Sequence, residues 1–191
     1  FAARRPVTME LQPFEQTLQL ARAFKQHDIP FALGGAMALA YWAEPRATLD
    51  IDVNVFVPER DAARVLGVVR GLGATVREDE DLPEIEKTGQ VRIDWAGTYL
   101  DLFFAYDPFH DACRERAREV DFLGERVPVL SAEDLDVFKV IFNRPKDWLD
   151  VEAMVAIQGD AFDAAYTRRW LTAILGEDDG RLARFDELAR R

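Results

Sequence analysis

The stretch that decides the fold begins with Gly34-Gly35 and ends with Arg46-Ala47-Thr48-Leu49-Asp50-Ile51-Asp52. Side chains of a β-strand alternate between its two faces, so Asp50 and Asp52 share one face with Thr48 and Asn54. The opposite face is apolar enough to lie on a core. Two like charges this close cost energy unless a cation lies between them. A divalent metal such as Mg²⁺ is an obvious candidate, and a solvated face on a half-exposed sheet is the alternative.

The glycine pair ends a short apolar run, 31–33, and begins a second one, 36–42, which indicates a strand that enters a helix. Two glycines at such a turn let the backbone approach a ligand closely, and a helix N-terminus favours phosphate. A glycine pair alone usually marks only a turn. Followed by a strand with Asp50 and Asp52, it predicts a phosphate-binding turn beside a metal site, as nucleotidyl transfer requires.

This pattern, two glycines after an apolar strand and then Arg-x-Thr-x-Asp-x-Asp, resembles the DNA-polymerase-β-like nucleotidyltransferase superfamily. The segment Phe138-Lys139-Val140-Ile141-Phe142-Asn143-Arg144-Pro145-Lys146-Asp147-Trp148-Leu149-Asp150-Val151 is similar to its AbiEii-like branch, which includes the MenT-type toxins of bacterial toxin–antitoxin systems. The resemblance covers residues 30–155. The chain departs from it at Gly35, where many members have Ser.

The resemblance implies a Mg²⁺-dependent enzyme that transfers a nucleoside monophosphate from an NTP to RNA, with the tRNA 3′ end as acceptor and a cognate antitoxin as partner. It implies that Asp50, Asp52 and Asp101 bind metal, and that Asp101 also draws the proton from the attacking hydroxyl. Lys139 and one aspartate of the later segment would belong to the active site. The residues predicted to bind the nucleotide are Gly34, Gly35, Arg46, Thr48 and Lys139.

Asp101 lies in a very apolar segment, 99–104, that is predicted to be the second strand of a hairpin with 91–95. A buried carboxylate is costly unless it is paired or bound to metal. If this strand lies beside 48–56, Asp101 completes a cluster of three carboxylates. The alternatives are an edge-strand charge that reaches water, and Asp94 as the third acid in its place.

Lys139 lies on an otherwise apolar helix face, so it either extends to water or reaches the triphosphate. Asp147 and Asp150 lie one turn apart at the start of the next predicted helix. One of them is expected to cap that helix, and the other to fix Lys139 or Arg144. The sequence does not decide which aspartate belongs to the active site.

Composition limits the class of protein. The chain has 191 residues and a net charge of −11, which argues mildly against broad coating of nucleic acid. We expect a cytoplasmic protein, because Cys113 has no partner for a disulfide, the N-terminus lacks a signal-peptide apolar region, and no apolar run could span a bilayer. His27 and His110 have no companions at ligand spacing, so a zinc site is not expected.

The predicted fold class is α/β (α+β). Residues 1–130 are predicted to form a nucleotidyltransferase domain with a mixed β-sheet flanked by helices, and residues 131–191 a helical C-terminal domain. Helices are expected at 14–27, 36–43, 59–71, 109–118, 132–143, 146–158, 161–175 and 180–190, and strands at 31–33, 48–56, 91–95, 99–104, 120–123 and 126–129. The acidic run 78–86 is expected to be a solvated loop.

Three other functions stay open on the sequence alone. The acceptor could be a small molecule such as an antibiotic, or a protein side chain, or the chain could be a non-catalytic, antitoxin-like binding protein. If RNA binds, its phosphates should meet clustered arginines. These are Arg114, Arg116, Arg118, Arg168, Arg169, Arg181, Arg184, Arg190 and Arg191.

Overall fold

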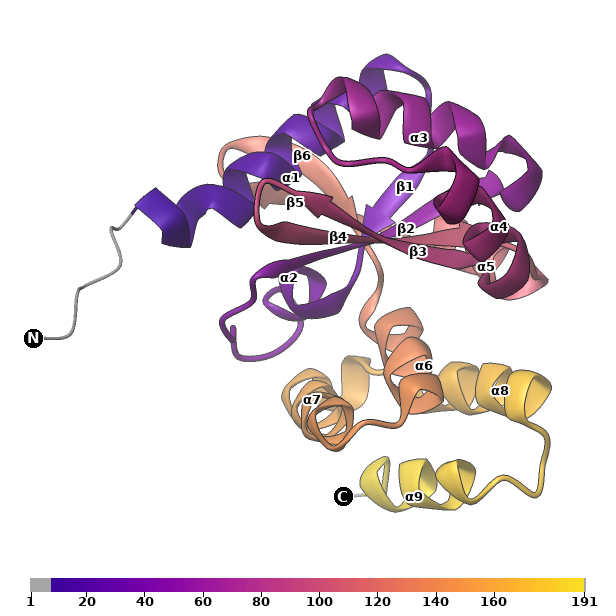
Figure 1. Cartoon of the computed structure of the whole chain (residues 1–191). Coiled ribbons are helices and arrows are strands. Elements are labelled where there is room, and N and C mark those ends of the chain that lie inside the picture. Colours follow the sequence, from indigo (N-terminus) through magenta and orange to yellow (C-terminus); the bar gives the residue numbers. More distant parts are fainter. Residues whose placement is uncertain (1–7, 191) are drawn as a thin grey trace, which may run out of the picture.

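The computed structural model describes residues 8–190, with side chains from residue 12 onward. Its centre is a six-stranded mixed sheet of order β3-β4-β2-β1-β6-β5 (Figure 1). The strands are β1 (Phe31–Leu33), β2 (Asp50–Pro58), β3 (Gln90–Trp95), β4 (Thr98–Ala105), β5 (Arg118–Phe122) and β6 (Glu125–Val129). Pairing is parallel for β2 with β4 and for β1 with β6, and antiparallel elsewhere. The predicted α/β class is confirmed.

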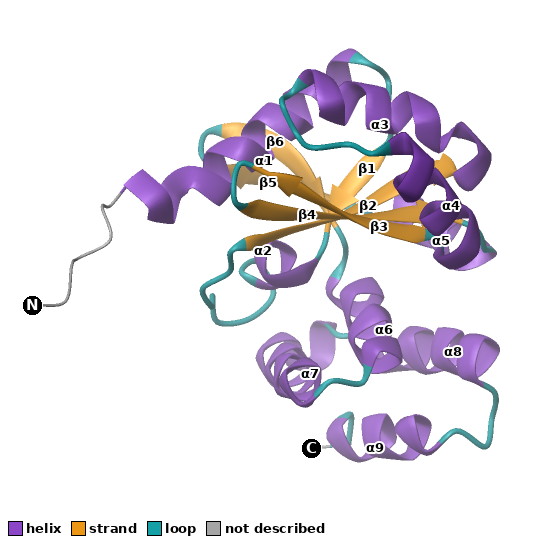
Figure 2. Cartoon of the chain, in the orientation of Figure 1, coloured by secondary structure: helices purple, strands orange, loops and turns teal. Residues whose placement is uncertain are grey.

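The helices fall into two groups along the chain, one before and one after the last strand (Figure 2). The first group comprises α1 (Thr8–Gln26), α2 (Gly35–Leu39), α3 (Ala62–Gly71), α4 (Glu78–Thr88) and α5 (Pro108–Arg116). The second comprises α6 (Ala132–Phe142), α7 (Pro145–Gln158), α8 (Ala164–Leu175) and α9 (Gly180–Leu188). In the view of Figure 1, α1 and α3 cover the upper face of the sheet, while α2 and the second group lie below it. The division of the chain into two separate domains stays a prediction.

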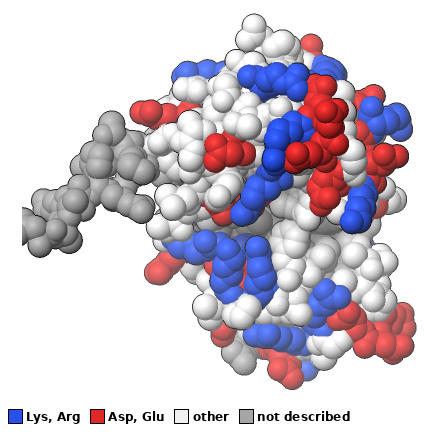
Figure 3. Space-filling model, in the orientation of Figure 1, with Lys and Arg blue, Asp and Glu red and all other residues white. Residues whose placement is uncertain are grey.

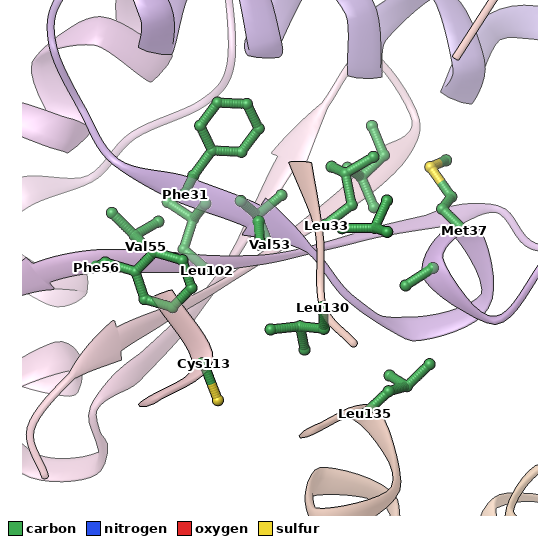
Figure 4. Close-up of a cluster of buried hydrophobic side chains, with 14 of the residues drawn as sticks. Phe31, Leu33, Met37, Val53, Val55, Phe56, Leu102, Cys113, Leu130 and Leu135 are labelled. Atoms are coloured by element: carbon green, nitrogen blue, oxygen red, sulfur yellow. The ribbon is translucent and has the colours of Figure 1, made fainter. Parts of the chain in front are cut away.

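The apolar faces of the central strands form the core. Ile51 and Val53 of β2 and Leu100 and Leu102 of β4 are fully buried, as their alternation with polar neighbours requires. Figure 4 shows how this core continues through Leu130 toward the helical half. Because apolar side chains join the sheet to α6, the polar face of β2 lies opposite that helix.

One predicted loop is wrong, because the acidic run is the helix α4. Its first turn carries Glu78, Asp79, Glu80 and Asp81, where negative charge complements the helix dipole. The Asp81 carboxylate accepts the N–H of Arg77 at 2.7 Å, and Ile85 on the inner face is buried. A run of acids with Pro83 resembles a solvated turn in sequence, but burial on one face makes it a helix.

Other boundaries differ by smaller amounts. The second hairpin turns at Leu123-Gly124 rather than at Gly124-Glu125, because both turn residues have positive φ, as a type I′ turn requires. Strand β2 begins at Asp50, so Thr48 precedes the strand rather than belonging to it. Helix α1 begins earlier than predicted, at Thr8, and α2 ends earlier, at Leu39. Residues 1–7 and 191, including predicted Arg191, lie outside the described residues.

None of the helices in the described part of the chain combines the length and the apolarity that crossing a membrane requires.

Candidate active site

The structure brings Asp50, Asp52 and Asp101 to one face of the sheet. Strands β2 and β4 run parallel in register, so Asp52 lies directly opposite Asp101 and Asp50 lies opposite Tyr99. Strand β4 is flanked by β2 and β3, so Asp101 is not an edge-strand charge. Asp94, the alternative third acid, lies on the edge strand β3 and lines neither of the two cavities described below.

A guanidinium already lies among these carboxylates. Arg92 of β3 donates from Nε and Nη2 to the two oxygens of Asp101 at 2.8 and 2.7 Å, and its Nη2 is 3.7 Å from Asp50. These hydrogen bonds with Asp101 raise the pKa of the Arg92 guanidinium above its usual range. The predicted site did not include Arg92, yet the two-residue turn Ala96-Gly97 fixes a register that pairs it with Asp101.

Burial and like charge disfavour the ionised form of Asp52. Burial raises its pKa most, Asp101 and Asp50 raise it further, and Lys139 and Arg144 lower it, to leave the pKa at about 6. A carboxylate with such neighbours gains from any additional cation in the cavity.

The glycine pair packs against Asp52, and its two members have different roles. Gly35 has a φ of +52°, and a Cβ at this position would lie 1.8 Å from an Asp52 carboxylate oxygen. Any larger residue would therefore displace Asp52. The Gly34 N–H donates to the Asp52 carbonyl at 2.8 Å and Gly34 does not line the cavity, so its binding of phosphate stays a prediction. Gly35 lines the cavity instead.

Lys139 is buried and does not extend to water. Its Nζ lies 2.6 Å from Asp150 Oδ2, and only 4% of the residue is exposed. Arg46, from the loop before β2, donates to the same carboxylate at 3.1 to 3.3 Å. Burial raises the pKa of Asp150, but the hydrogen bonds from Arg46 and Lys139 outweigh it and lower the pKa. Asp150 thus holds two cations together at the cavity.

Asp147 performs the equivalent task for Arg144. Its carboxylate accepts the Arg144 backbone N–H at 3.1 Å at the start of α7 and the Arg144 Nε at 2.6 Å. Each aspartate of the segment therefore orients cations, and neither lines the cavity itself. Both are positioning residues, and Asp147 is the one that also caps the helix.

The cavity between the sheet and α6 has a volume of about 60 Å³ and combines an acidic floor with a cationic rim. The rim is formed by Arg46, Lys139, Arg144 and Lys146. Thr48 also lines the cavity, and its hydroxyl accepts a hydrogen bond from the Asp50 N–H at 3.1 Å. The wall that sequence reasoning missed is apolar, because helical periodicity marks its residues only as core. It consists of Phe103, Leu130, Leu135, Phe138 and Phe142.

A second, open groove of about 580 Å³ adjoins the cavity beyond Asp101. Arg92 and Asp101 line both hollows, and the outer wall of the groove is formed by Glu80 and Glu84 of α4 with Arg77. Figure 3 shows the acidic side chains of this helix gathered beside a stripe of basic ones.

The clustered arginines predicted to meet RNA phosphates are largely occupied within the chain. Arg168 pairs with Asp186 at 3.0 Å, and Arg181 pairs with Asp179 at 2.7 Å. Arg116 pairs with Glu133 at 2.8 Å. Arg184 stacks over Trp148, and Arg169 over Tyr166. These contacts favour a structural role for most of that cluster.

Within residues 8–190, no three His, Cys, Asp or Glu side chains already converge as a metal-binding group. The donors present are nevertheless carboxylate oxygens, which suit Mg²⁺, and this ion is often held by one or two carboxylates together with substrate phosphates. The residues therefore fit a metal that arrives with a nucleotide.

A family model described as the nucleotidyl transferase AbiEii toxin of type IV toxin–antitoxin systems matches residues 18–189. The chain belongs to this AbiEii family. It is therefore a nucleotidyltransferase of a toxin family, and membership implies a nucleotide substrate and an antitoxin partner. No protein of curated function matches the chain in sequence.

Solved structures share the fold of this AbiEii protein. The antibiotic-resistance factor ANT(2″)-Ia is 16% identical with a TM-score of 0.63, over 95% of this chain and 97% of that chain. The lincosamide antibiotic adenylyltransferase LnuA, bound to lincomycin, is 15% identical with a TM-score of 0.50, over 76% of this chain and 96% of that chain. At such identities the likeness shows the fold alone.

We expect Gly35→Ala to lower the free energy of unfolding by roughly 1–3 kcal/mol, because the added Cβ strains a positive φ and displaces Asp52. Equilibrium urea unfolding in a chelator measures this loss. Gly67→Ala in α3 is the control, since a Cβ there meets no atom within 4 Å. A Gly35→Ala variant as stable as the wild type would contradict the packing described.

Without metal, Asp52→Asn should raise the thermal midpoint more at pH 8 than at pH 5. The folded-state pKa of Asp52 is about 6, above its ordinary value of 3.8, so ionisation costs the folded state stability as pH rises through that interval. The neutral amide avoids this loss. Asp79→Asn, at an exposed position on α4, is the control. The difference between its thermal midpoint and that of wild type should be the same at pH 5 and pH 8. A pH-independent gain for Asp52→Asn would argue against the charge cluster.

Proposed function

We propose that the protein transfers a nucleoside monophosphate from an NTP to an RNA acceptor, the tRNA 3′ end, in a Mg²⁺-dependent reaction that inhibits growth until a cognate antitoxin intervenes. The observation that carries the chemistry is the face shared by Asp50, Asp52 and Asp101, opposite the cationic rim of the cavity. The RNA acceptor rests on the family, whose members are toxins.

Asp50, Asp52 and Asp101 are the residues that would hold Mg²⁺. When bound, the ion would neutralise phosphate charge and stabilise the attacking and leaving oxygens. Binding would also relieve the repulsion that raises the pKa of Asp52.

The remaining residues act by position and charge. Lys139 and Arg46, oriented by Asp150, face the side from which the triphosphate enters, and Arg144 and Lys146 extend the same rim. Gly35, at the start of α2 and on the wall of the cavity, would donate its backbone N–H to a phosphate oxygen. The acceptor hydroxyl attacks the α-phosphorus, its proton passes to Asp101, and the bond to pyrophosphate breaks.

A small cationic acceptor is the second candidate, favoured by the groove beyond Asp101. An acceptor that reaches Asp101 from this groove passes Glu80 and Glu84 of α4, which repel a phosphate backbone and attract an amine. ANT(2″)-Ia, which shares the fold, has been solved in complex with adenylyl-2″-tobramycin, at 16% identity and a TM-score of 0.61 over 92% of this chain and 98% of that chain.

The chemistry is tested with each labelled NTP, Mg²⁺ and total RNA. We expect Asp101→Asn to lose at least ~100-fold in transfer rate, because it removes the proton acceptor and one metal ligand. Asp94→Asn is the matched control on the neighbouring strand, and we expect its rate to stay within about twofold of wild type, as for surface changes away from the site. Equal rates in the two variants would contradict the assignment of Asp101.

The acceptor is tested by mass spectrometry of the products, with tRNA and an aminoglycoside supplied side by side. Nucleotide added to the tRNA 3′ end supports the RNA proposal. Nucleotide added to the aminoglycoside, with every RNA unmodified, would overturn it and leave the transfer chemistry standing.

A further inference from the structure

The Arg92 guanidinium lies beside two of the three carboxylates, Asp101 and Asp50. It forms a bidentate pair with Asp101 and reaches within 3.7 Å of Asp50 across the intervening strand. Bidentate pairs of this kind are among the stronger hydrogen bonds in proteins. The carboxylate oxygens that this fork engages are the same oxygens that would ligate a metal.

The backbone fixes where Arg92 begins but leaves its side chain able to move. Strand β3 is the edge of the sheet, and its register with β4 sets Arg92 opposite Asp101. The side chain of Arg92 is 54% exposed, whereas that of Asp101 is 15% exposed. A long side chain with one end in water can leave the pair without disturbing the core.

A second position for the guanidinium is available next to the first. Arg92 borders the groove whose outer wall carries Glu80 and Glu84. These two carboxylates would keep its charge favourable after it leaves Asp101.

We propose that Arg92 is a positioning residue that takes the place of the divalent cation in the empty enzyme, and that a nucleotide-borne metal displaces it into the adjoining groove. The guanidinium neutralises Asp101 and Asp50 when no metal is bound, and it competes with free metal for their oxygens. This inference rests on the metal of the proposed function.

The test is direct binding of Mn²⁺, used as a spectroscopic and calorimetric probe, without nucleotide. Arg92→Gln should bind Mn²⁺ about tenfold more tightly than wild type, equivalent to about 1.4 kcal/mol, because the metal no longer displaces a bidentate pair. Arg92→Lys keeps the charge but cannot form the bidentate pair, so its Mn²⁺ affinity should lie between those of wild type and Arg92→Gln. In a chelator, the Arg92→Gln thermal midpoint should fall, and Mn²⁺ should raise it by more than it raises that of wild type.

Arg77→Gln is the matched control, since it removes one positive charge from the same groove at a residue that pairs with Glu80 and not with the three carboxylates. Its Mn²⁺ affinity should stay within about twofold of wild type if direct contact with the carboxylates, rather than net charge, determines Mn²⁺ binding. Equal affinities for Arg92→Gln and Arg77→Gln would overturn the inference about Arg92 alone. Absence of Mn²⁺ binding in wild type and Arg92→Gln alike, both without nucleotide and with a non-hydrolysable NTP, would overturn the metal proposal, and this inference with it.

Discussion

The repulsion between the carboxylates of β2 and β4 is the constraint around which the rest of the site is arranged. Parallel pairing sets Asp52 directly opposite Asp101, and like charges directly opposite each other destabilise a sheet. Burial strengthens the conflict, as the raised pKa of Asp52 records. A fold that retains this arrangement requires compensating positive charge, from its own side chains or from a ligand.

The chain supplies such charge with three side chains. Arg92 approaches from the edge strand, and Lys139 and Arg144 from the helical half. Lys139 is oriented by Asp150 and Arg144 by Asp147, so the α6–α7 segment holds both cationic side chains in a fixed geometry. Because Arg92, Lys139 and Arg144 each pair with an aspartate, the cavity keeps a cationic rim over an acidic floor. Such an arrangement suits a triphosphate that enters with a metal.

Local patterns in the sequence predicted one half of this site, and long-range contacts decide the other. Strand alternation placed Asp50 and Asp52 on one face, and the two-residue turn would also have placed Arg92 opposite Asp101. The pairing of β2 with β4 and the contact of Arg46 with Asp150 join residues far apart in the chain, which no local period encodes. The acidic helix α4 was missed because only the burial of Ile85 against the core distinguishes it from a solvated loop.

The most direct measurement is a crystal structure of the protein with Mg²⁺ and a non-hydrolysable NTP. The account predicts a metal between the triphosphate and the oxygens of Asp50 and Asp52, with the phosphates against Lys139 and Arg46. It also predicts that the Arg92 guanidinium has left Asp101 for the groove lined by Glu80 and Glu84. A nucleotide bound elsewhere, with Arg92 still paired to Asp101 and no metal on the three carboxylates, would contradict it.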